Sequence, residues 1–128
     1  MRIAIVEPKP SRNNYAEVFG GSWSFEQYSL SSDPELKKVL KKDVDIDMNP
    51  DNFDWIILVG AEPLKFYTKA TKVMEYSGTL VDDKYLPLIN PAMVSFKPEV
   101  KRLLESSVDN IKKYMSGDRK KGEIGDAF

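Results

Sequence analysis

Polar side chains that could perform chemistry gather in three stretches, and each stretch directly follows a short apolar run. Residues 7–14 follow RIAIV, residues 60–63 follow WIILV and residues 90–97 follow YLPLI. The first stretch combines a carboxylate, cations, a hydroxyl and amides, which suit a phosphate or a nucleobase. A loop rich in asparagine can also cap its own backbone without any ligand. Its polar residues are Glu7, Lys9, Ser11, Arg12, Asn13 and Asn14.

The other two stretches offer backbone, amides, hydroxyls and lysines. Gly60 would let the backbone approach a ligand, with Lys65 facing a phosphate, or it could serve a tight turn between a strand and a helix. Asn90, which precedes a proline, could aim its amide at a base edge while Ser95 and Lys97 contact a phosphate. Asn90 could equally cap the turn that follows it.

Composition removes several classes of chemistry. The 128 residues contain no cysteine and no histidine, which excludes disulfides, thiolate metal sites, cysteine nucleophiles and imidazole catalysis. Neither of the glycine-rich patterns GxxxxGK[ST] and GxGxxG occurs, so no nucleoside triphosphate or dinucleotide site is predicted. We therefore expect no cofactor and no metal, and any reaction must use carboxylates, amides, hydroxyls or lysines.

The hydropathy pattern predicts one α/β domain over residues 1–116, followed by a mobile polar tail or linker over 117–128. Strands are expected at 2–6, 24–30, 55–59 and 85–89, and helices at 33–42, from residue 63, and from residue 98 to 116. Pro87 favours a position at an edge or a bulge for the last strand. Strands that alternate with helices indicate a three-layer α/β/α fold with a mainly parallel four-stranded sheet. In such sheets ligands bind beyond the carboxyl ends of the strands, where the three polar stretches would meet.

The order of short motifs resembles the uracil-DNA glycosylase superfamily, especially its bacterial iron-sulfur branch. The similarity runs from residue 54 to 111, and IAIVEPKPSRNNYAEVFGG is similar to the family's first motif. Two catalytic groups differ: Glu7 lies one position before the expected water-activating acid, and Asn90 stands in place of the motif histidine. The cluster cysteines are missing and the middle of the domain is shorter. The later motifs correspond to Val59-Gly60, Ser77-Gly78, Asn90-Pro91-Ala92 and Lys97-Pro98.

This resemblance implies a glycosylase-like fold that has lost most of its catalytic activity. Cleaving the glycosidic bond requires a flipped base, stabilisation of the departing uracil and a positioned water. Losing one preorganised donor costs about 10²–10³ in rate in other enzymes. The chain also resembles the short glycosylase-like domains joined to, or encoded beside, family A DNA polymerases of bacterial viruses. Partners implied by the resemblance are therefore DNA and a replication protein such as a polymerase, in the cytoplasm of a bacterial host.

Three functions compete on this basis. The first is an inactive or weakly active relative that binds DNA or a replication partner. The second is an active glycosylase in which Glu7 or Asn13 positions water and Asn90 holds the pyrimidine. The third is a protein-interaction module or host-directed inhibitor whose five aspartates in residues 43–54 imitate DNA. Apolar runs are too short to cross a membrane, and no membrane association is expected. The residues predicted to contact nucleic acid are Lys9, Ser11, Arg12, Asn13, Lys65, Ser95, Lys97 and Lys101.

Overall fold

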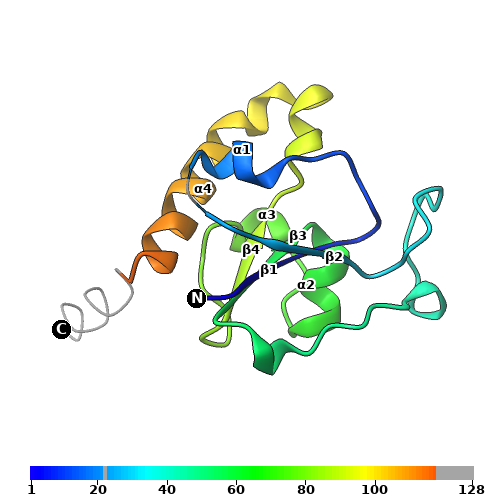
Figure 1. The fold of residues 1–128 in the computed structure, drawn as a ribbon. Helices are drawn as coiled ribbons and strands as arrows, with labels where there is room; N and C mark the ends of the chain where they lie inside the picture. The colour runs from blue at the N-terminus through cyan, green and yellow to red at the C-terminus, as the bar shows by residue number, and fades with distance from the viewer. Residues whose placement is uncertain (22, 118–128) are drawn as a thin grey trace.

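A computed structural model describes residues 1–21 and 23–117 as a parallel sheet with helices on both faces (Figure 1). Most of the tail predicted at 117–128 lies outside the described residues. No helix in the described part of the chain is long and apolar enough to cross a membrane. The strands are β1 (Ile3–Glu7), β2 (Glu26–Ser29), β3 (Trp55–Val59) and β4 (Tyr85–Leu88), and the α-helices are α1 (Tyr15–Phe19), α2 (Ala61–Tyr67), α3 (Val73–Tyr76) and α4 (Lys101–Met115).

The predicted four-stranded parallel sheet is confirmed, with strand order β2-β1-β3-β4. Ile3 lies opposite Trp55 in the central pair, so the two most apolar runs of the chain occupy the middle of the sheet. β4 is an edge strand, as Pro87 predicted, because proline has no N–H to donate to a further strand. The Pro87 carbonyl instead accepts a hydrogen bond of 2.9 Å from the Gly78 N–H.

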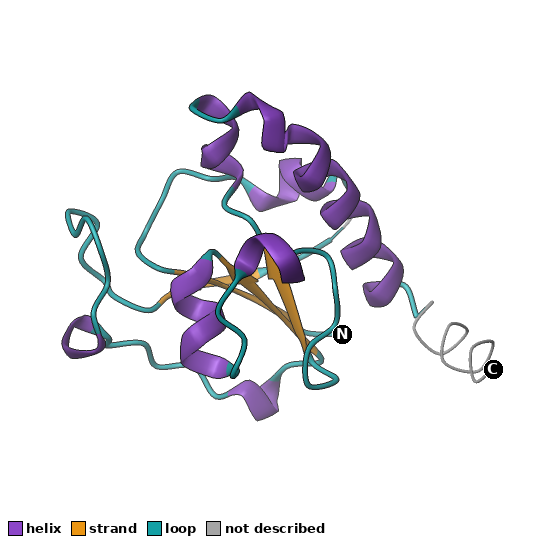
Figure 2. Cartoon of the chain, turned by 180° about the vertical axis from the view of Figure 1, so that it is seen from behind, coloured by secondary structure: helices purple, strands orange, loops and turns teal. Residues whose placement is uncertain are grey.

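Successive side chains of the central strands point alternately into two separate apolar cores, one on each face of the sheet. The sheet and the segments that cover its two faces form the three layers. Ile5 and Ile57 face α1 and α4, whereas Val6 and Ile56 face α2 and the long segment 30–54. Figure 2 shows the helices on both sides of the sheet. Since β1 and β3 are buried on both faces, their sequences are continuous apolar runs rather than alternating ones.

The helix predicted at 33–42 is wrong. The chain there has turns without a regular helix, and only the single 3₁₀ turn η1 (Lys41–Asp43) follows. Side chains bind backbone groups that would otherwise form the hydrogen bonds of a helix. The Asp33 carboxylate, for example, accepts from the Glu35 N–H at 2.9 Å. Further along, the Lys9 ammonium donates to the Leu36 carbonyl. Such local bonds compete with helix formation, and the segment instead covers one face of the sheet in extended form.

The helix predicted from residue 98 is confirmed, but its first turn is a 3₁₀ turn and not an α-helical one. Pro98 begins a 3₁₀ turn, η4 (Pro98–Val100), and α4 continues from Lys101 to Met115. Its buried stripe contains Val108, Ile111 and Met115, which pack on the same face of the sheet as α1. This helix therefore anchors the chain that follows β4 to the core.

Candidate functional site

A buried carboxylate lies at the carboxyl edge of the sheet, where ligands bind in this class of fold. Glu7 is the last residue of β1 and is only 2% exposed. Its Oε2 accepts hydrogen bonds from the Ser11 hydroxyl, from the Tyr15 hydroxyl at 2.7 Å and from Asn13 Nδ2 at 3.4 Å. Its Oε1 accepts from Gln27 Nε2 at 3.1 Å. Four neutral side chains thus surround the carboxylate, and no ion pair within the described residues involves it.

Asn13 joins this carboxylate to the loop after β4. Its Nδ2 donates to Asn90 Oδ1 at 3.1 Å, across 77 positions of sequence. The same Asn90 oxygen accepts from the Ala92 N–H at 3.0 Å, so Asn90 caps the 3₁₀ turn η3 (Pro91–Ser95). Asn90 therefore caps the turn that follows it, and its contact with Asn13 also brings the first and last loops together. We call Glu7, Ser11, Asn13, Tyr15, Gln27 and Asn90 the Glu7 cluster.

The Tyr15 hydroxyl stays protonated in this environment. Burial raises its pKa, and the charge of the Glu7 carboxylate raises it further. Both effects disfavour a second negative charge beside the first. At neutral pH Tyr15 is consequently a permanent hydrogen-bond donor to Glu7. Because its hydroxyl also accepts from Asn13 Nδ2 at 3.1 Å, it fixes the orientation of that amide as well.

A second polar contact fixes the end of β4. The Ser77 hydroxyl donates to Ser107 Oγ at 2.7 Å and accepts from the Ile89 N–H at 3.1 Å. Gly78 has φ of +84°, and a Cβ there would lie 2.8 Å from Ser107 Cα. The Ser77-Gly78 turn is thus a packing joint between β4 and α4. It holds the residue before Asn90 in place.

The predicted basic residues are divided between two regions. Arg12, Lys97 and Lys101 are exposed on or beside the first and last loops, which the Asn13 to Asn90 bond brings together. Lys65 lies elsewhere, on α2. The stretch 60–63, predicted as a loop, is the start of that helix, with Gly60 at φ of +88° as its N-cap. The Lys9 ammonium donates a hydrogen bond to the Leu36 carbonyl at 2.5 Å, so one of its N–H groups is already used within the protein.

Sequence reasoning missed three residues of this region. Tyr15 and Gln27 belong to the Glu7 cluster: Tyr15 directly follows the first polar loop, whereas Gln27 lies within the second predicted strand and carries no comparable sequence signal. Phe96 is 72% exposed between Ser95 and Lys97. An aromatic residue flanked by polar ones, just after a predicted ligand loop, could have drawn attention to it. Ser95 is itself exposed on the same turn.

The arrangement suits binding better than proton transfer. A general base must offer a lone pair to the proton that it removes. Each Glu7 oxygen already accepts at least one hydrogen bond inside the protein. The Asn90 oxygen accepts two, whereas its Nδ2 makes no hydrogen bond within the described residues and remains available as a donor. No group of carboxylates in the part that the structure describes could hold a metal ion.

Comparison with known proteins gives one informative similarity. No family model matches the chain, and no solved structure matches it. A protein named "DNA polymerase" from Escherichia phage T5 is 27% identical over 136 aligned positions. The alignment covers 98% of this chain but 16% of the polymerase. Nearly the whole chain is therefore similar to a small region of a much longer phage DNA polymerase.

Proposed function

We propose that this chain is a non-catalytic domain of the uracil-DNA glycosylase type, which binds DNA as part of, or beside, a phage DNA polymerase. Two independent findings support this proposal. The order of strand and loop motifs resembles the glycosylase superfamily, and nearly the full chain is similar to a region of a phage polymerase. Its place of action would be the cytoplasm of an infected bacterium, where viral DNA is replicated.

The observation that carries the proposal is the closed state of the Glu7 carboxylate. A carboxylate that activates water needs contact with that water, yet Glu7 is 2% exposed and accepts four hydrogen bonds from side chains. Taking Oε2 away from its donors would leave the buried Tyr15 hydroxyl without its acceptor, which costs about 1–3 kcal/mol. The cluster therefore stabilises the loops instead of performing a reaction.

The surface beside the cluster has features that suit nucleic acid. Phe96 projects a largely exposed ring, with Lys97 next to it and Lys101 one turn further along. Stacking of a base on an aromatic ring contributes about 1–3 kcal/mol. Arg12 on the first loop adds a cation that can pair with a phosphate. The formal net charge of the chain is −1, so attraction of DNA would depend on such local groups of cations and not on the overall charge.

Catalysis is tested with a uracil-containing oligonucleotide followed by alkaline cleavage. We expect no abasic sites above the buffer control, while a known uracil-DNA glycosylase cleaves the same substrate. Abasic sites that form with the wild-type chain and disappear in Glu7→Gln would show that the carboxylate is catalytic. That result would overturn the non-catalytic assignment.

DNA binding is tested by fluorescence anisotropy with a labelled single-stranded oligonucleotide. Binding should weaken between 50 and 200 mM salt, and Phe96→Ala and Lys97→Glu should each weaken it by about tenfold. Lys113→Glu is a matched control, because it makes the same charge change at the far end of α4. Equal loss in Lys97→Glu and Lys113→Glu, or binding that is independent of salt, would contradict the proposed surface.

A further inference from the structure

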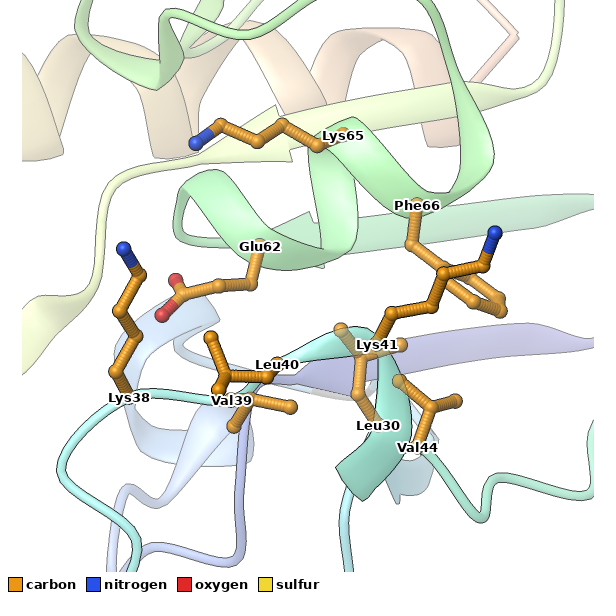
Figure 3. A pocket seen from close by; sticks show the side chains of 9 residues that line it. All are labelled: Leu30, Lys38, Val39, Leu40, Lys41, Val44, Glu62, Lys65 and Phe66. Carbon is orange, nitrogen blue, oxygen red and sulfur yellow. The ribbon is translucent and has the colours of Figure 1, made fainter.

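A groove separates α2 from the extended segment 38–44, on the face of the sheet opposite α4. It encloses about 440 Å³, within the range of about 300–1,000 Å³ that is typical of ligand sites. Leu30, Val39 and Val44 supply aliphatic side chains to its lining. Figure 3 shows that both walls contribute lysines, Lys65 from α2 and the other two from the segment. We call this site the lysine groove, with Lys38, Lys41 and Lys65 as its cations.

The wall formed by the segment is built into the fold. The Asp45 N–H donates to the Leu30 carbonyl at 2.8 Å, which closes the loop between these two residues. The Leu40 N–H donates to the Asp43 carboxylate at 3.0 Å and fixes the turn η1. Val39, the residue before Leu40, is buried. The groove therefore exists before a ligand arrives, which lowers the ordering cost of binding.

Positive charge dominates the groove. Three lysines line it together with one carboxylate, Glu62. None of these four groups forms an ion pair within the described residues. In Figure 3 the Lys38 and Lys65 side chains extend toward the same end of the groove, while Lys41 lies toward the other end. A ligand with carboxylates at both ends would find a cation for each.

Apolar surface is exposed beside these charges. Leu40 and Phe66 are each 46% exposed, although both are large hydrophobic residues. Phe66 is held edge-on by Tyr67, with ring centroids 4.9 Å apart. Together with the aliphatic lining, they would cover a large apolar side chain brought by a ligand. Burial of that side chain would supply affinity, while the lysines would select its neighbours by charge.

We propose that the lysine groove docks an acidic segment of a protein partner, with one large apolar side chain against the aliphatic lining and carboxylates at the lysines. Single-stranded DNA fits less well, because Phe66 supplies a single exposed ring and the branched aliphatic side chains of the lining provide no platform for successive bases. A peptide can also use Glu62 as an acceptor for one of its backbone N–H groups. This docking site is separate from the DNA surface at Phe96 and does not depend on it.

The test uses a random peptide library selected against the wild-type chain. We expect the selected peptides to be enriched in aspartate and glutamate around a leucine, phenylalanine or tryptophan. The tightest synthetic peptide is then titrated against Lys38→Glu/Lys41→Glu, which should bind at least about tenfold more weakly. The control is Lys37→Glu/Lys42→Glu, which makes the same charge change at exposed lysines outside the groove. We expect less than a twofold effect there.

Three results would overturn the proposal. The first is a selection without acidic enrichment, and the second is an equal loss of peptide binding in both double variants. The third is an oligo(dT) probe that binds the wild-type chain and is lost only in Lys38→Glu/Lys41→Glu, which would assign the groove to nucleic acid. Circular dichroism checks that the variants are folded. If the double variant unfolds, Lys65→Glu on the opposite wall provides the same test.

Discussion

Replacing Tyr15 by phenylalanine removes one hydroxyl from the Glu7 cluster and leaves the aromatic ring in the core. The hydroxyl donates to Glu7 Oε2 at 2.7 Å and accepts from Asn13 Nδ2 at 3.1 Å. A hydrogen bond to a charged group contributes about 1.5–3 kcal/mol. We therefore expect the free energy of unfolding to fall by about 1.5–3 kcal/mol at pH 7, which corresponds to about 6–12 °C in Tm for a domain of this size.

The same substitution should change the response to alkali. The pKa of Tyr15 is raised in the folded chain, whereas in the unfolded chain it titrates near its usual value of about 10. Above about pH 10 the folded state therefore keeps a proton that the unfolded state loses. The contribution of the Tyr15 hydroxyl to the free energy of unfolding is complete below about pH 10 and decreases above it. At pH 11 the loss reaches about 1.4 kcal/mol. Tyr15→Phe lacks this titration, so the stability gap between the two chains should narrow by that amount.

Urea unfolding at pH 7, 9 and 11, followed by circular dichroism, measures both effects. Tyr76→Phe is the matched control, because Tyr76 is 41% exposed and lies outside the Glu7 cluster. It should change stability by less than about 0.5 kcal/mol. Equal stability of Tyr15→Phe and the wild type at pH 7 would refute the structural role of the cluster. A gap that stays constant up to pH 11 would refute the account of the Tyr15 proton.

Two further substitutions test the surroundings of Asn90. Gly78→Ala should lower stability by about 2–4 kcal/mol, because it combines a positive φ with a close approach to Ser107, and thermal unfolding would measure this. Gly20→Ala at φ of +61° has open space around its Cβ, so it should cost only about 1–2 kcal/mol, and an equal loss at both glycines would contradict the packing argument. Asn90→His should yield no uracil excision in the alkaline cleavage assay, because the histidine alone does not open the carboxylate cluster. Abasic sites formed by that variant would show that the missing imidazole was the only defect.

The apolar runs of the sequence were sufficient to predict β1, β3 and β4, whereas β2 was predicted from the alternation of residues 24–30. RIAIV and WIILV are too short and too rich in β-branched residues for helices, and continuous burial requires layers on both faces. Pro87 predicted the edge position of β4, since a strand interior to the sheet needs its N–H groups. The periodicity of α4 likewise predicted its buried stripe. These features depend on residues close together in sequence, which is why the pattern alone revealed them.

The segment 33–42 shows where local patterns fail. Its spacing of Leu36 and Val39 is compatible with a helix, but the Leu36 carbonyl is bound by the Lys9 ammonium, which comes from a different loop. Asp33 and Ser31 bind nearby backbone N–H groups as well. The competition between helix and side-chain bonds was thus decided partly by a tertiary contact. The same extended segment forms one wall of the lysine groove, which the sequence did not indicate.

The sequence by itself determined which groups the candidate site contains: a glutamate after the first strand, an asparagine after the last, and no histidine or cysteine anywhere. It could not determine what the glutamate does, because that depends on partners from β2, the first loop and α1. Only the folded chain brings Asn13 to within 3.1 Å of Asn90 and covers Glu7 with four donors. A carboxylate open to water can act as a base, whereas a buried carboxylate that accepts hydrogen bonds from side chains of several elements holds those elements together. That difference resides in tertiary contacts and not in residue type.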